Sequence, residues 1–137
     1  KIPQKETLCS EFYPSRKTES KIFKQILEKT NYTPFKTNAL GVSLLKMIEG
    51  KVSTFYKLNV KPWDIIAGAA ILSSNKNWDI TLFLKDNSIS SPFSNSKNFI
   101  DHLNVCFSDN CRIGTLIITL KSQKRIKDII INEVLNS

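Results

Sequence analysis

The chain has 137 residues, of which 41% are hydrophobic and 23% are charged, and this composition excludes a disordered chain. The length suits one domain with its own core. No apolar run approaches the ~20 residues of a membrane-spanning helix, so we expect no transmembrane segment. The first residues form no signal peptide, and because the sequence does not begin with Met we expect a fragment of a longer protein.

The formal net charge is +8, which favours anionic ligands. Most lysines and arginines are scattered, and no zinc-finger, RNA-recognition or helix-turn-helix pattern accompanies them. We therefore expect a basic solvated surface and no nucleic-acid partner. Four basic residues gather near the start of the last predicted helix: Lys121, Lys124, Arg125 and Lys127.

The three cysteines are too few for a disulfide scaffold. Cys106 and Cys111 could pair with each other or remain reduced thiols, so the redox compartment stays open. Together with His102 these cysteines lack a fourth zinc ligand. His102 is the sole histidine, and we expect it to be a surface residue rather than a catalytic one.

The hydrophobic pattern predicts strands and helices that alternate along the first half of the chain. Apolar residues recur at helical spacing in two stretches, with short strand-like runs between them. Pro34 indicates that its strand lies at an edge of the sheet or ends there. The second helix is expected to bury four aliphatic side chains: Leu40, Leu44, Leu45 and Ile48. In order, we expect a linker with a short strand near 7–12 (residues 1–14), a turn at 15–18, a helix over 20–30, a strand over 31–36 and a helix over 39–49.

The second half continues the alternation and leads to the expected fold class. Buried strands are indicated by β-forming cores at 80–84 and 116–118, and residues 99–107 are compatible with either a helix or a strand. Such alternation favours an α/β domain with a mixed, largely parallel sheet flanked by helices. In order, we expect a strand over 51–58, a helix over 62–72, a strand over 78–85, a loop over 86–96, a strand over 114–119 and a helix over 121–135.

The stretch from Lys61 to Leu72 carries one acid at the entrance of an otherwise apolar segment. Pro62 is tolerated at a helix start, and Asp64 follows within the first turn. A carboxylate there is favoured by the helix dipole and by the backbone N–H groups, which is one explanation of Asp64. A buried acid on a rigid helix also usually has a charged partner or a functional role.

Part of the chain resembles a known family of phosphatases. The stretch Trp63-Asp64-Ile65-Ile66-Ala67-Gly68, together with Gly41 and residues 47–56, is similar to the C-terminal signature of the inositol monophosphatase-like, magnesium-dependent phosphatases. The nearest branch looks like the 3'(2'),5'-bisphosphate nucleotidases, including the Golgi form. The resemblance implies that residues 15–137 are the second, C-terminal domain of that fold, without the N-terminal metal-binding domain. It leaves the location open between the cytoplasm and the Golgi lumen.

The resemblance also implies site residues. Asp64 stands where the family has one ligand to Mg²⁺, whereas the other ligands come from an acidic loop that this chain lacks. Ser15 and Arg16 match a turn that contacts the nucleotide, and the alternative is a polar helix entry. Gly41 matches a glycine placed near the substrate, and the alternative is close helix packing. Lys76-Asn77 replaces the family's Gly-Gly turn, a departure close to the site.

Two functions therefore remain open. The first is the C-terminal portion of a phosphomonoesterase that uses Mg²⁺-activated water on 3'-phosphoadenosine 5'-phosphate-type nucleotides or inositol phosphates. The second is a non-catalytic remnant or binding module of the same fold. We expect the missing N-terminal domain as a partner, and we expect exposed apolar surface and self-association in its absence.

Overall fold

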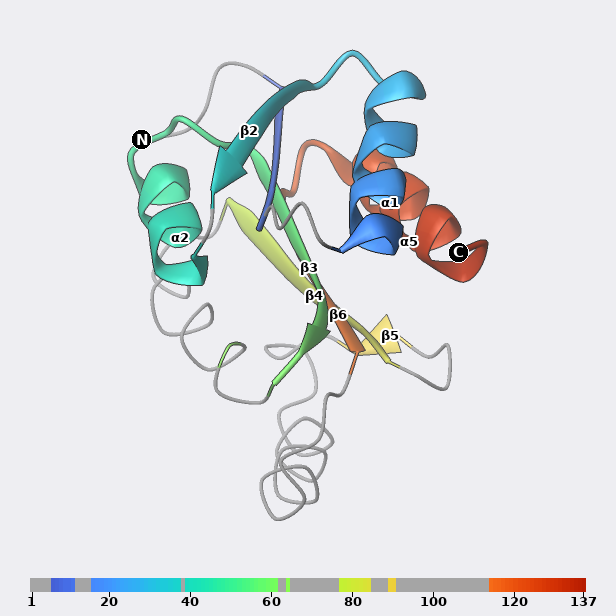
Figure 1. Ribbon diagram of the computed structural model, residues 1–137. Helices are drawn as coiled ribbons and strands as arrows, with labels where there is room; N and C mark the ends of the chain where they lie inside the picture. Colours follow the sequence, from blue (N-terminus) through green and yellow to red (C-terminus); the bar gives the residue numbers. More distant parts are fainter. Residues whose placement is uncertain are drawn as a thin grey trace.

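The computed structural model describes residues 6–11, 16–37, 39–61, 64, 77–84, 89–90 and 114–137. They form strands and helices whose order follows the predicted alternation through β3 (Figure 1). The elements are β1 (Thr7–Glu11), α1 (Lys17–Glu28), β2 (Thr33–Thr37), α2 (Leu40–Ile48), β3 (Thr54–Val60), β4 (Trp78–Leu84), β5 (Ile89–Ser90), β6 (Gly114–Leu120) and α5 (Lys124–Leu135).

The strands make one six-stranded sheet with the order β2-β1-β3-β6-β4-β5. Strand β1 pairs in parallel with β2 and with β3, whereas β3 with β6, β6 with β4, and β4 with β5 are antiparallel. The predicted α/β fold with a mixed sheet is confirmed, but its parallel part is smaller than expected. The short strand expected near residues 7–12 is β1, and it lies in this sheet between β2 and β3.

Helices cover both faces of the sheet, with α1 and α5 on one face and α2 on the other (Figure 1). Helix α1 buries Ile22, Phe23 and Ile26, which form one stripe at helical spacing. Helix α2 turns Leu44 and Met47 toward the opposite face. The connection from β1 to β2 and the connection from β2 to β3 therefore run on opposite faces of the sheet.

The set of α2 side chains that is buried against the sheet differs from the expected set. Leu44 is buried as expected, but Leu45 and Ile48 are 51% and 43% exposed, so the expectation that they are buried is wrong. The buried positions of α2 are 43, 44 and 47, which recur at intervals of three and four residues. An apolar residue outside that stripe points to solvent whatever its hydrophobicity.

Smaller differences concern where elements begin. Helix α1 begins at Lys17, so Lys17 and Thr18 are helical rather than part of a turn. Strand β5 lies in a segment expected to be a loop. The helix expected over 62–72, apart from Asp64, and the segment 99–107 lie outside the described residues, as do Cys106, Cys111 and His102. No described helix combines the length and the apolar character needed to cross a membrane.

Candidate functional site

Three of the expected site residues follow the carboxyl ends of three neighbouring strands. Because β1, β2 and β3 are parallel, their carboxyl ends meet at one edge of the sheet. Arg16 precedes α1 after β1, Gly41 lies in the first turn of α2 after β2, and Asp64 follows β3. In open α/β sheets this edge, where successive connections diverge to opposite faces, is the usual ligand site. We call it the carboxyl-edge site.

Asp64 is nearly buried, with 9% of its surface exposed. Its Oδ2 accepts a hydrogen bond from the Lys61 amide at 3.0 Å and lies 3.4 Å from the Lys57 ammonium. The Asp64 amide in turn donates to the Lys61 carbonyl at 3.0 Å. A side chain that bonds the amide three residues earlier is typical of an acid in the first turn of a helix. The backbone-binding explanation of Asp64 is therefore observed, and within the described part of the chain both side-chain contacts of Asp64 are made by Oδ2.

The sequence gives no sign of the cation that faces Asp64. Lys57 belongs to β3, and its side chain is only 16% exposed beside Asp64. Just after it, the pairing of β3 with β6 shifts between Lys57 and Val60, and Asn59 has a φ of 53°. Asparagine tolerates this left-handed conformation better than most residues. Such an irregularity bends a strand, so it brings the end of β3 and the segment with Asp64 together.

A buried polar cluster holds the start of α2 against the strands. The Cys9 Sγ lies 3.6 Å from the Ser43 hydroxyl and 3.7 Å from the Thr37 hydroxyl, and the two hydroxyls contact each other. Ser43 also donates to the Ala39 carbonyl at 3.1 Å. Buried polar groups that satisfy one another fix a local arrangement, so this cluster fixes the N-terminal turn of α2 at the carboxyl edge.

Gly41 lies in open space within this turn. A Cβ built on it would meet no atom within 4 Å, so close helix packing does not explain the glycine. The missing side chain leaves the backbone of the first turn accessible to a ligand. The first amides of a helix have no partner within the helix, and together with the helix dipole they attract anions.

Arg16 supplies a second cation to the carboxyl-edge site. Its side chain is 46% exposed, and Nη1 lies 3.5 Å from the Glu19 carboxylate one turn further along. An exposed pair of this kind is weak, so it does not prevent the guanidinium from binding phosphate. Ser15 lies outside the described residues, and its expected role stays a prediction.

The described residues alone do not fit a magnesium ion. They contain no group of three or more His, Cys, Asp or Glu residues that could hold a metal. Magnesium prefers six oxygen ligands, and Asp64 offers one carboxylate whose Oδ2 already faces a cation. Further acids from elsewhere would have to complete any such site.

Comparisons with known proteins show which solved structures share this architecture. No protein-family model and no curated protein matches the sequence. Among solved structures, the chain is similar to the inositol monophosphatase of Thermotoga maritima, with a TM-score of 0.59 and 16% identity over 98% of this chain and 43% of that chain. The inositol monophosphatase of Anabaena (Nostoc) gives a TM-score of 0.56 and 17% identity over 99% of this chain and 47% of that one.

A third similar structure is an inositol monophosphatase/NADP phosphatase complexed with Mg²⁺ and phosphate, with a TM-score of 0.52 and 16% identity over 94% of this chain and 42% of that one. The chain thus spans less than half the length of each of these three structures. It shares its α/β fold with structures of the inositol monophosphatase family.

Proposed function

We propose that this chain is the C-terminal, substrate-binding portion of a phosphomonoesterase, and that the phosphorylated substrate binds at the carboxyl-edge site. The observation that carries the proposal is the position of Arg16, Gly41 and Asp64 after three adjacent parallel strands. The similarity to phosphatase structures supports it, because one of them binds Mg²⁺ and phosphate. Because one fold can host many functions, the proposal rests on the residues of the site and not on the fold alone.

The residues of the site have separate tasks in this proposal. Arg16 binds a phosphate through its planar guanidinium, and Lys57 contributes a second, partly buried positive charge. The amides of the first turn of α2 beside Gly41 donate hydrogen bonds to the same anion. Asp64 is oriented by the Lys61 amide and offers one carboxylate to a metal site whose other ligands lie elsewhere in the protein.

The substrate class follows from the positive charge at this edge. Lys57 and Arg16 suit a substrate with more than one anionic group, which includes 3'-phosphoadenosine 5'-phosphate and inositol phosphates. We propose both as test substrates. When it is bound, Mg²⁺ would polarise the ester and lower the pKa of a water molecule.

The outer face of α2 supports a partner half. Val42, Leu45 and Ile48 are 42%, 51% and 43% exposed, and they share one side of the helix that carries Gly41. Large apolar side chains grouped on a surface are typical of an interface. Because the chain spans less than half of its structural neighbours, we propose that this face packs against the remaining, acid-bearing portion of the protein.

The test is magnesium-dependent phosphate release from 3'-phosphoadenosine 5'-phosphate and inositol 1-phosphate. We expect no release from the 137-residue chain alone. A longer protein that includes the acidic portion should release phosphate from one of the two, and Asp64→Asn should lower the rate by at least about 100-fold, because it removes a negatively charged metal ligand. Asp128→Asn is the matched control, since Asp128 is exposed on α5.

Three outcomes would contradict the proposal. Release by the chain alone that depends on Asp64 would show that the site is complete. Release that is unaffected by Asp64→Asn would remove Asp64 from the site. No release from the longer protein would favour the second function, a non-catalytic binding module. The Lys57 ammonium beside Asp64 is the observation that favours this alternative, because it takes the position of a cation. Both functions predict that the phosphate ester binds without Mg²⁺, and only the phosphatase predicts its hydrolysis.

A further inference from the structure

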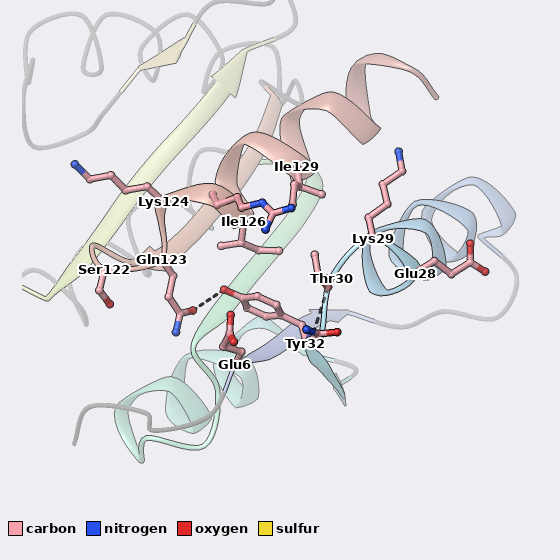
Figure 2. A pocket seen from close by; sticks show the side chains of 12 residues that line it. Glu6, Glu28, Lys29, Thr30, Tyr32, Ser122, Gln123, Lys124, Ile126 and Ile129 are labelled. Atoms are coloured by element: carbon pink, nitrogen blue, oxygen red, sulfur yellow. Dashed lines mark hydrogen bonds between the residues drawn. The ribbon is translucent and has the colours of Figure 1, made fainter.

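A cavity lies on the other face of the sheet, away from α2. It has a volume of about 510 Å³ and is bounded by the end of α1, the segment before β2 and the beginning of α5 (Figure 2). Volumes of this size are typical of small-molecule sites. Ile126 and Ile129 of α5 give it an apolar wall, and the ring of Tyr32 stands beside them.

The beginning of α5 concentrates positive charge at this cavity. Lys124 and Arg125 line it, and among the described residues neither forms an ion pair. The first turn contains no acid, and the side chain of Gln123, at the N-cap position, makes no capping hydrogen bond. Its Oε1 instead accepts a hydrogen bond from the Tyr32 hydroxyl at 2.8 Å (Figure 2). Cations at a helix N-terminus are unfavourable because the positive end of the helix dipole lies there, and a bound anion would offset this repulsion.

A buried hydroxyl lies near Tyr32, a residue that lines the cavity. Thr54 is fully buried, and its Oγ1 has no hydrogen-bond partner among the described residues. It is nevertheless close enough to Tyr32 to lower the pKa of the phenol. Burial and the neighbouring Glu6 outweigh this effect and raise that pKa to about 12, so Tyr32 keeps its proton and can donate. Unsatisfied buried hydroxyls are uncommon and often mark a place where a polar atom is missing.

The acids at the cavity set the direction of a ligand. Glu6 stands next to Tyr32, and Glu28 lies at the end of α1, whereas Lys29 forms an ion pair with the buried Glu133. Of the described cations that line the cavity, Lys124 and Arg125 at the beginning of α5 are therefore those that form no ion pair with another described residue. The positive charge would attract an anionic group to the beginning of α5, and the rest of such a ligand would then extend toward Tyr32.

We propose that this cavity is a second ligand site, separate from the carboxyl-edge site, for a small organic anion. Its phosphate or carboxylate group lies against the first turn of α5 and Arg125. Its flat apolar body lies against Ile126, Ile129 and the Tyr32 ring. The proposal does not depend on the phosphatase activity, since this cavity lies beside the residues that precede β1 and β2, at the end of these strands opposite to the carboxyl-edge site.

The test is isothermal titration calorimetry combined with amide NMR shifts, using phenyl phosphate and benzoate as probes. Inorganic phosphate and phenol, which each carry only one half of the expected ligand, are the comparison probes. We expect saturable binding of phenyl phosphate or benzoate, with shifts at the amides of residues 123–126. The stronger of the two probes identifies the anionic group, and phosphate or phenol alone should bind at least about tenfold more weakly.

Arg125→Gln should weaken binding by about tenfold or more, the worth of one charge-assisted hydrogen bond. Lys121→Gln is the matched control, since Lys121 is exposed, does not line the cavity and carries the same charge.

The proposal is overturned if neither aromatic anion binds, or if Arg125→Gln and Lys121→Gln have equal effects. Shifts at Arg16, Gly41 and Lys61 instead of 123–126 would assign the probe to the carboxyl-edge site and would equally overturn it.

Discussion

Replacing Gly114 with alanine is expected to lower the free energy of unfolding by about 3 kcal/mol or more. A Cβ at this position would lie 2.2 Å from the Phe83 carbonyl oxygen and 3.0 Å from the Leu84 Cα, both backbone atoms of the neighbouring strand β4. The φ of Gly114 is also 151°, a conformation that side chains disfavour. Urea unfolding followed by circular dichroism measures the change.

Gly41→Ala provides the matched control within the same chain. Its Cβ would meet no atom within 4 Å, and alanine is the better helix former by about 1 kcal/mol. We expect a variant that is as stable as the original protein or more stable. Equal stability of Gly114→Ala and Gly41→Ala would contradict the close approach of β6 and β4.

Removing the two cations of the carboxyl-edge site is expected to have the largest effect on ligand binding. Arg16→Gln and Lys57→Met should each weaken the affinity for inositol 1-phosphate by about tenfold or more, since a hydrogen bond to a charged group contributes about 1.5–3 kcal/mol. Lys57→Arg should preserve most of the affinity, because it keeps the positive charge beside Asp64. Titration calorimetry without Mg²⁺ gives these affinities.

Lys24→Gln is the control for net charge, since Lys24 is exposed on α1. Its affinity should stay within about twofold of the original, as expected for a distant charge screened by salt. If Lys24→Gln weakens binding as much as Lys57→Met does, binding follows the overall charge of +8 and not a site.

The local elements could be predicted because their periodicity is local. The stripe of α1 and the apolar run of β6 identify their own structure. The position of β6 between β3 and β4, antiparallel to both, depends on pairings far apart in the sequence. No periodicity specifies such a pairing, and this is why the expected sheet was too parallel.

The candidate site likewise contains residues that the sequence analysis predicted and residues that it missed. Asp64, Arg16 and Gly41 were found through a family resemblance and not through a pattern that physical chemistry alone could identify. Lys57 was missed, because its contact with Asp64 depends on the shifted register of β3 and on the left-handed Asn59. The exposed Leu45 and Ile48 were also missed, because sequence alone does not show which side of an almost wholly apolar helix faces the sheet.

The carboxyl-edge site is tested most directly by an amide NMR titration of the chain with inositol 1-phosphate, which lacks the flat group expected at the second cavity. We predict shifts that gather in three segments far apart in the sequence, at Arg16 and Lys17, at Gly41 and Val42, and at Lys61. Lys57→Met should abolish most of them. Shifts confined to residues 123–126, or no saturable shift at any concentration, would contradict a phosphate-ester site at the carboxyl ends of β1, β2 and β3.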